Sequence, residues 1–201
     1  MINKEELVIA AFDFDGTITT KDSLLDLYKY SFGNRKFIKG LIIHSLDILF
    51  YMIGIKKNDE VKEKLFKYFF KNISENEFNT LCNAYCENRL ETIINSVALE
   101  KIKWHKEKGH VVVIISASFE TWIKPWANKN GIEEVICTQY EVVNNQITGN
   151  IKGKNCHGIE KVNRLIEKYP KKEEYILYAY GDSKGDLDLL KFSDHPHFKK
   201  Y

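Results

Sequence analysis

Four short, uninterrupted apolar runs are the main pattern in the sequence. They are LVIAAF at 7–12, VVVII at 111–115, VIC at 135–137 and YILYAY at 175–180. Runs without polar alternation are typical of strands buried on both faces, as in a parallel sheet covered by helices. Helical patterns at 118–131 and 158–170 separate the last three runs. This alternation predicts an α/β fold with a doubly wound, mostly parallel sheet.

The gap between the first and second runs is too long for one crossover helix. Residues 18–97 carry helical patterns throughout, including a capping box in which Glu77 follows Ser74 by three positions. We therefore predict two parts, a core formed by residues 1–17 and 98–201 and a helical cap inserted at 18–97.

Two other segments have shorter patterns. Residues 139–151 indicate a small hairpin with Asn144 and Asn145 at its turn, and we expect this hairpin to be peripheral. Near the end of the chain His195 and His197 flank a proline, which favours a surface turn over a metal site.

The most apolar stretch of the predicted cap is GLIIHSLDILFYMIGI at 40–55. It is shorter than the ~20 apolar residues of a membrane span and contains Asp47, so we predict a buried cap helix or an interface helix. The lysines around it are Lys39, Lys56, Lys57, Lys62, Lys64 and Lys67. We expect these lysines to form a solvated face, or alternatively to attract an anionic substrate or a membrane surface.

Composition adds limits on function and location. Apolar residues make up 44% of the 201 positions, charged residues 29%, and the formal net charge is +2. The near balance of charge and the presence of only three arginines argue against a nucleic-acid surface. The four cysteines form no C-x-x-C pair and no secretory signal precedes the first run, so we expect reduced thiols and a cytoplasmic protein. The oligomeric state is left open.

Polar side chains follow three of the predicted strands. Asp13 and Asp15 follow the first, Ser116 the second, and Asp182 and Asp186 the fourth. Ligands of open α/β sheets bind beyond the carboxyl ends of the strands, where we expect these residues to meet. Two unit charges ~4 Å apart repel by about 4 kcal/mol at an effective dielectric near 20, which a shared cation would relieve. Ligand sets made only of oxygen favour Mg²⁺.

An Asp-x-Asp pair suits phosphoryl transfer. One aspartate can attack phosphorus and form an aspartyl-phosphate. A second acid, two residues later on the same strand face, can protonate the leaving oxygen and afterwards activate water. Gly16 allows a sharp turn whose backbone N–H groups can hold phosphoryl oxygens. A calcium loop is the alternative, but it would need further oxygen ligands at fixed steps.

Four motifs in order resemble those of the haloacid dehalogenase (HAD) superfamily. They are DFDGT at 13–17, SAS at 116–118, CHGIEK at 156–161 and YGDSKGD at 180–186. The helical insert, the SAS sequence and the Cys-x-Gly-x-x-Lys spacing are similar to the phosphoserine-phosphatase-like hydrolases of subfamily IB. The resemblance covers nearly the whole chain. It implies a HAD-like Rossmannoid core with an inserted cap, and a Mg²⁺-dependent phosphatase of small phosphomonoesters.

The resemblance also implies roles for the acidic residues. Asp13 would be the nucleophile and Asp15 the general acid and base. The Asp13 side chain, the Asp15 backbone carbonyl and Asp182 would hold Mg²⁺. Asp186 would orient the phosphate-binding lysine or reach the metal through water.

Phosphate binding is implied for Thr17, Ser116 and a lysine. We favour Lys161 because it completes the Cys-x-Gly-x-x-Lys pattern, with Lys154 as the alternative. Asp22 stands where phosphoserine phosphatases carry a glutamate that binds the substrate's amino group, so the resemblance implies substrate recognition there. The shorter acid argues against phosphoserine itself as the substrate.

Two alternative functions accompany this hypothesis. A lipid-phosphate phosphatase of the phosphatidylglycerophosphate type, acting at a membrane surface, is favoured by the apolar stretch at 40–55 and its lysines. A receiver-like signalling domain would also combine acids, a hydroxyl and a lysine, but without a long insert after its first strand. The expected partner is a small phosphorylated substrate, with a peripheral membrane contact under the lipid alternative.

Overall fold

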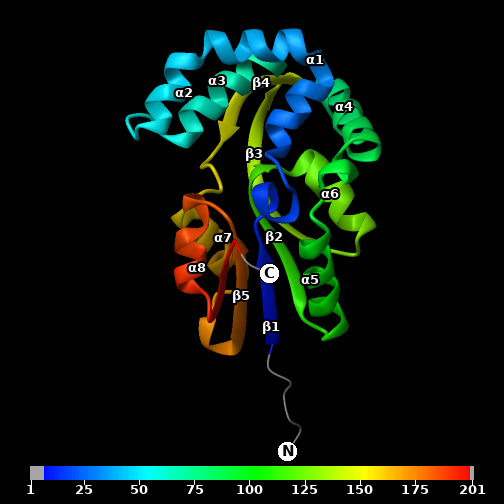
Figure 1. Ribbon diagram of the computed structural model, residues 1–201, viewed down its shortest axis with the longest axis vertical. Coiled ribbons are helices and arrows are strands. Elements are labelled where there is room, and N and C mark those ends of the chain that lie inside the picture. The colour runs from blue at the N-terminus through cyan, green and yellow to red at the C-terminus, as the bar shows by residue number, and fades with distance from the viewer. Residues whose placement is uncertain (1–6, 200–201) are drawn as a thin grey trace, which may run out of the picture.

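The computed structural model describes residues 7–199. Its strands are β1 Leu7–Phe12, β2 Val111–Phe119, β3 Glu134–Val143, β4 Gln146–Lys152, β5 Tyr175–Gly181 and β6 His195–Phe198. They form one sheet in the order β4-β3-β2-β1-β5-β6 (Figure 1). Neighbouring strands pair in parallel except β3 and β4, which are antiparallel. The predicted α/β fold with a mostly parallel sheet is confirmed.

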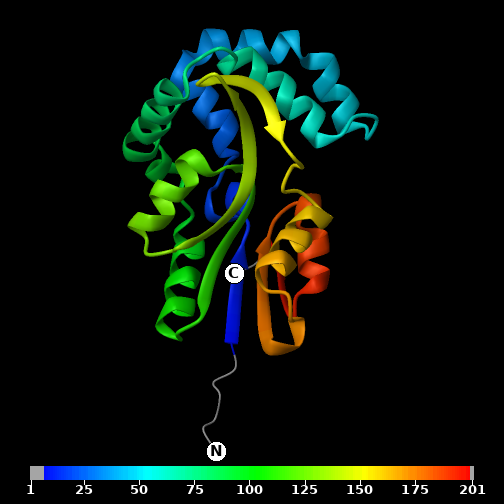
Figure 2. The same ribbon diagram turned by 180° about the vertical axis from the view of Figure 1, so that it is seen from behind.

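Helices cover both faces of this sheet. Their bounds are α5 Ser96–Glu107, α6 Glu120–Lys129, α7 Ile159–Lys168 and α8 Leu187–Phe192. Helices α5 and α6 lie on one face and α7 and α8 on the other (Figures 1 and 2). Ala10 and Phe12 of β1 belong to the core under α5 and α6, whereas Ile9 and Ala11 belong to the core under α7 and α8. Alternate residues thus bury against different layers, which explains the uninterrupted apolar runs.

The remaining helices lie across the carboxyl end of the sheet (Figure 1). Their bounds are α1 Ser23–Ile43, α2 Ser45–Met52, α3 Asn58–Phe70 and α4 Glu75–Asn88. The two ends of this insert run side by side. The backbone N–H of Thr20 donates to the carbonyl of Ile93 at 2.7 Å, and that of Asn95 donates to Ile18 at 2.8 Å. We keep the name cap for residues 18–97, because this pairing supports the proposed division from the core.

Two local signals of the sequence are confirmed in detail. Ser74 Oγ accepts the N–H of Glu77 at 3.2 Å, and the Glu77 carboxylate accepts the N–H of Ser74 at 3.0 Å, which completes the capping box of α4. Asn144 and Asn145 have φ values of 51° and 59°, as a two-residue turn between β3 and β4 requires.

The β3–β4 hairpin is not peripheral, contrary to our expectation. Ile147 of β4 is fully buried, accepts the N–H of Asn72 and donates to the carbonyl of Ile73, both at 2.9 Å. Gly149 has a φ of 86°, and a Cβ there would lie 2.7 Å from the Cα of Lys67 on α3. The hairpin therefore joins the sheet to the cap by direct backbone contact.

The histidines near the end of the chain lie in a strand, so the expected surface turn is wrong. His195 pairs with Tyr178 and His197 with Tyr180 in the parallel register of β6 on β5. The rings of Tyr180 and His197 stack with their centroids 4.5 Å apart. Pro196 is tolerated because β6 is an edge strand.

The apolar stretch at 40–55 forms the end of α1, all of α2 and the following loop, and most of it is exposed. No residue of α2 is buried, so of the two alternatives the buried helix is wrong there and the interface helix stays a prediction. Lys62 was expected on a solvated face, but it is buried on α3. Within residues 7–199, no helix combines the length and apolar character needed to cross a membrane.

Candidate active site

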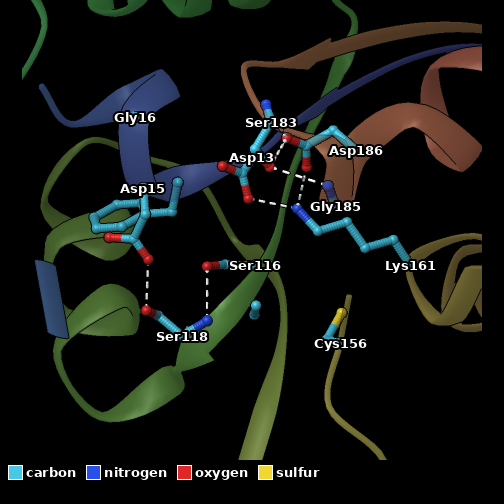
Figure 3. Close-up of polar contacts among 12 residues, drawn as sticks. Asp13, Asp15, Gly16, Ser116, Ser118, Cys156, Lys161, Ser183, Gly185 and Asp186 are labelled. Carbon is cyan, nitrogen blue, oxygen red and sulfur yellow. Dashed lines mark hydrogen bonds and ion pairs between the residues drawn. The ribbon is translucent and has the colours of Figure 1, made fainter. Parts of the chain in front are cut away.

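The ends of β1 and β5 and the first turn of α7 bring three charged side chains together (Figure 3). The Lys161 ammonium donates to Asp13 Oδ1 and, at 2.6 Å, to Asp186 Oδ1, and all three residues are buried. Lys154, the alternative lysine, is instead exposed on the surface, 4.0 Å from Glu160. The convergence expected from the strand ends is therefore present, with Lys161 as its lysine.

The loop before α7 holds Lys161 in this position. Cys156 is fully buried, and its N–H donates to the Thr138 hydroxyl at 2.9 Å. Gly158 begins the helix with a φ of 60°, a conformation that favours glycine, and donates to the carbonyl of Gly185 at 2.9 Å. The Cys-x-Gly-x-x-Lys spacing thus reflects a buried anchor, a glycine turn and a lysine directed at the sheet.

The buried charges of this cluster are unevenly balanced. Burial, reinforced by the charges of Asp186 and Asp15, raises the pKa of Asp13 to about 8 despite the adjacent Lys161. Burial opposes ionisation of Lys161 as well, but the two aspartates outweigh it and hold its pKa above the usual value. A single lysine therefore does not compensate all the acids gathered here, and a further cation would.

The acidic cluster suits a hard divalent cation. Asp13, Asp182 and Asp186 each offer one carboxylate oxygen, and these oxygens lie within 4.8 Å of one another. Asp182 Oδ1 is buried without a hydrogen-bond partner in the described chain. Gly16 allows this approach, because a Cβ there would lie 2.4 Å from Asp182 Oδ2. Carboxylate oxygens are the ligands that Mg²⁺ prefers, so these residues fit the predicted metal.

Asp186 is already engaged by protein groups. Its Oδ1 accepts from Lys161, and its Oδ2 accepts the N–H groups of Asp182 and Ser183 at 3.2 and 3.0 Å. Burial opposes its ionisation, but Lys161 and the bonds from Ser183 hold the pKa of Asp186 below its usual value. These contacts favour the orienting role for Asp186 and leave Asp13 and Asp182 as the carboxylates available to a metal.

The Asp15 side chain turns away from this cluster. Its carboxylate accepts the Ser23 N–H at 2.6 Å and the Ser118 hydroxyl at 2.5 Å (Figure 3). Asp15 also lines the cavity described below, so an acid with a fixed orientation faces the space next to Asp13. Ser118 was not predicted as the partner of Asp15. The signal was the second serine of SAS, which stands two residues after Ser116, where the pairing of β2 with β3 becomes irregular.

The two predicted phosphate-binding hydroxyl residues lie beneath the cavity surface. Ser116 is buried, and its Oγ accepts the N–H of Ser118 at 3.0 Å. Thr17 is fully buried, and its carbonyl accepts from Asn95 at 3.3 Å. Neither residue is among those that line the cavity, so phosphate binding by their side chains stays a prediction.

A cavity of about 380 Å³ lies between the strand ends and the cap. Asp13, Asp15, Lys161 and Asp182 line its core side. The cap contributes an apolar wall formed by Leu24, Leu25, Tyr28, Val61 and Leu65. The volume of the cavity lies at the lower end of the ~300–1,000 Å³ typical of small-molecule sites. The cavity therefore suits a small substrate, or the head of a larger one.

Asp22 lines the cavity and also starts a helix. Its side chain accepts the N–H of Leu25 at 2.9 Å and caps the N-terminus of α1. The residue is open to solvent through the cavity, yet enclosure by the surrounding protein and the charge of Asp15 raise the pKa of Asp22 to about 6. Its hydrogen bond at the N-terminus of α1 accounts for an acid at position 22. Contact between Asp22 and the substrate stays a prediction.

Lys62, one of the lysines expected either on a solvated face or as an attractant for an anionic substrate, lines the cavity. Its ammonium donates to the carbonyl of Ala117 and, at 3.3 Å, to Asn155 Oδ1. Burial lowers the pKa of Lys62 to about 8, although Asp15 and Asp22 act in the opposite direction. Among residues 7–199 no carboxylate lies within ion-pair distance of this lysine. The cap thus places a cation in the cavity with only neutral hydrogen-bond partners.

A signal for Lys62 was present in the sequence. Leu65, Phe66 and Phe69 follow it at three, four and seven positions, and all three are buried. These steps define one face of a helix, so Lys62 occupies the apolar face of α3. A lysine on the buried face of a helix needs polar surroundings for its ammonium group, which here lie at the cavity.

Comparison with known proteins agrees with this arrangement. A family model described as haloacid dehalogenase-like hydrolase matches residues 10–191. Protein CicA of Caulobacter vibrioides (strain NA1000 / CB15N) is 27% identical over 201 residues, covering 96% of this chain and 86% of that protein. Histidinol-phosphatase of Neisseria meningitidis serogroup C (strain 8013) is 25% identical over 209 residues, covering 94% and 88%.

A solved structure described as a phospho-aspartyl intermediate analogue of phosphoserine phosphatase has a similar fold. The TM-score is 0.64 at 18% sequence identity, with 94% of this chain and 84% of that chain covered. At this level of identity the likeness concerns the fold. The fold and the family inferred from the four motifs are confirmed together.

Proposed function

This chain belongs to the haloacid dehalogenase-like hydrolases and is a phosphatase, and we propose that it hydrolyses a small phosphomonoester through an aspartyl-phosphate on Asp13. One observation carries the proposal. Asp13 is buried against Lys161 at the edge of a cavity that also holds Asp15 in a fixed orientation. A nucleophile, a cation for the phosphoryl group and a general acid are thus available within one small space.

The reaction has two steps. In the first, Asp13 attacks phosphorus, the bond from phosphorus to the ester oxygen breaks, and Asp15 gives that oxygen a proton. In the second, Asp15 takes a proton from water, the water attacks phosphorus, and the bond to Asp13 breaks to release inorganic phosphate. Lys161 balances the negative charge of the phosphoryl oxygens in both steps, with Ser116 and Thr17 as its proposed partners.

Mg²⁺ would be held by the Asp13 side chain, the backbone carbonyl of Asp15 and Asp182. The Oδ1 of Asp182, buried and without a hydrogen-bond partner among residues 7–199, supports this assignment. When bound, the ion would neutralise charge on the phosphoryl group and on the acids around it. Asp186 would keep Lys161 oriented, because its carboxylate is engaged by the lysine and by backbone N–H groups.

The substrate is further proposed to carry a second anionic group. Lys62 supports this, because its charge is buried at the cavity with two neutral acceptors, and a lysine has three donors. An uncompensated buried charge is costly, and a carboxylate or second phosphate on the substrate would compensate it. Asp22 stands in the same cavity as a candidate for contact with a cationic group of that substrate.

A lipid phosphomonoester is the second candidate substrate. The apolar wall formed mainly by α1 and α3 favours it, because a phosphate head could reach Asp13 while the first carbons of a chain contact that wall. The cavity of about 380 Å³ would admit the head group and leave the rest of such a lipid outside.

The first test is phosphate release from a generic aryl phosphate by the full chain. We expect release to require Mg²⁺, to stop on addition of a chelator and to return with excess Mg²⁺. Asp13→Asn should abolish it, whereas Glu107→Gln, which removes an exposed carboxylate on α5, should leave it unchanged. Turnover by Asp13→Asn would exclude Asp13 as the nucleophile. A stoichiometric phosphoprotein without turnover would favour the receiver-like alternative.

A further inference from the structure

We propose that the cap docks on the surface of an anionic bilayer through the end of α1, helix α2 and the loop that follows. Six large apolar side chains in this stretch are more than half exposed: Ile42, Ile43, Leu46, Met52, Ile53 and Ile55. We call these six residues the docking face. Single exposed apolar residues are ordinary, but a contiguous group is typical of an interaction surface.

The one charged side chain of helix α2 is engaged by neighbouring parts of the cap. Asp47, its one acid, binds Lys56 from the following loop and, at 2.7 Å, Lys64 of α3. His44, just before the helix, lies 3.5 Å from the same carboxylate. The acid is therefore neutralised from within the cap, while the apolar side chains point to solvent. Figure 1 shows α2 at one side of the cap, away from the helices that cover the sheet.

The charged residues around the docking face indicate which kind of partner binds there. Arg35, Lys36, Lys39 and Lys57 are exposed in the adjoining sequence. Asp47 is the only acid between residues 33 and 57, and Asp59 and Glu60 follow at the start of α3. Exposed cations next to an apolar surface match a bilayer with anionic head groups, each cation contributing about 1 kcal/mol near such a surface.

A second copy of the chain fits this surface less well. A two-fold interface places the same patch of both copies together, so the exposed Lys39 and Lys57 of one copy would approach those of the other. Like charges that meet across an interface repel, whereas lipid phosphates would attract them. Charge complementarity therefore favours the bilayer.

Docking in this way would place the mouth of the cavity near the lipid. Tyr51 lies at the end of α2, within the docking stretch, and also lines the active-site cavity. The surface and the site are thus continuous along one helix. The docking does not depend on the proposed reaction, because none of the six apolar residues lines the cavity.

The test is co-sedimentation of the full chain with vesicles. We expect binding to phosphatidylcholine vesicles that contain phosphatidylglycerol, weaker binding to phosphatidylcholine alone, and weakening by salt. The double variant Met52→Ser/Ile55→Ser should bind at least about tenfold more weakly, because it removes two buried apolar contacts with the lipid. The matched control Val143→Ser changes a side chain of β3 that is 52% exposed, and it should bind like the parent.

A charge variant separates the two contributions. Lys36→Gln/Lys39→Gln should weaken binding mainly at low salt, and Lys103→Gln on α5 is its control. Phosphate release from the aryl substrate without vesicles should be unchanged in all these variants, so failed docking and failed catalysis can be told apart. Absence of binding to the anionic vesicles would overturn the proposal. So would equal losses in the controls, or a dimer in solution that Met52→Ser/Ile55→Ser dissociates.

Discussion

The two sides of the active-site cavity differ in how their buried charges are satisfied. On the core side, Lys161 contacts two carboxylates, and Asp186 accepts from the lysine and two backbone N–H groups. On the cap side, Lys62 donates only to neutral oxygens and lies 4.6 Å from the centroid of the Phe119 ring, and no ion pair to it is formed within residues 7–199. The core side is thus organised before substrate arrives, while the cap side retains an unbalanced charge.

This difference indicates that the core side carries out the reaction and the cap side recognises the substrate. A preorganised set of charges stabilises the transition state without rearrangement, so the core side would act alike on any phosphomonoester. A buried charge without a direct ion pair is stabilised further by a ligand of opposite sign, so the cap side would distinguish one substrate from another. Variants on the two sides should therefore change different kinetic parameters.

Among variants that keep the nucleophile Asp13, the largest effect is expected from Asp15→Asn on the core side. Loss of a general acid costs roughly 10²- to 10⁴-fold in rate, and the asparagine can keep the hydrogen bond from the Ser23 N–H. The loss in kcat should be larger for an alkyl phosphate, whose leaving group needs a proton, than for an activated aryl phosphate. Steady-state kinetics with both substrates measure this. Equal losses with the two leaving groups would argue against a role in protonation.

A smaller effect, confined to one class of substrate, is expected from Lys62→Gln on the cap side. Its KM for a phosphomonoester that also bears a carboxylate should rise roughly tenfold or more, because a hydrogen bond to a charged group is lost. The KM for an aryl phosphate without a second anionic group should change little. Lys62→Arg keeps the charge and is the matched control. If both substrates lost affinity alike, Lys62 would contact the phosphoryl group itself.

The pH dependence of binding should follow the same lysine. Burial lowers the pKa of Lys62 to about 8, so the ammonium is present below this value and is lost as the pH rises through it. Affinity for the carboxylate-bearing substrate should therefore fall several-fold from neutral to alkaline pH. In Lys62→Arg the guanidinium stays charged, and this decline should disappear. If the affinity still declined with rising pH in Lys62→Arg, the decline would arise from another titrating group.

The smallest effect is expected from a change in the cap that avoids the cavity. Ser74→Ala removes the side-chain acceptor that caps α4 and should lower the free energy of unfolding by about 1 kcal/mol, with kcat unchanged. Thr80→Ala, on an exposed position of the same helix, is the control and should cost less. Denaturant titration of the three proteins gives the comparison. A fall in kcat for Ser74→Ala would mean that cap stability and chemistry are coupled.

The core side of the site was predictable from sequence, because its residues follow from strand order. Asp13 and Asp186 stand just beyond two buried apolar runs, and parallel strands bring such positions to one edge. The choice of Lys161 over Lys154 came from the resemblance to the family's Cys-x-Gly-x-x-Lys motif, and the structure places Lys161 in the cluster. Local patterns sufficed here because each strand end is positioned by its own strand.

The cap side was not predictable in the same way. The burial of Lys62 depends on how α3 sits over the sheet, and the contact between Ile147 and the cap depends on a hairpin that reaches α3. The apolar pattern of α2 suggested burial, yet tertiary packing leaves it exposed. Packing between distant segments decides all three outcomes, and no short window of sequence contains it.

The most direct test of the account is to trap the intermediate. The enzyme is acid-quenched during turnover of an aryl phosphate with Mg²⁺, and the peptides are mapped by mass spectrometry, with Asp13→Asn treated in parallel. We predict the mass of one phosphoryl group on the peptide at Asp13, and none on that peptide in the variant. Continued release of phosphate with no modified peptide, or a phosphoryl group on another residue, would contradict the account.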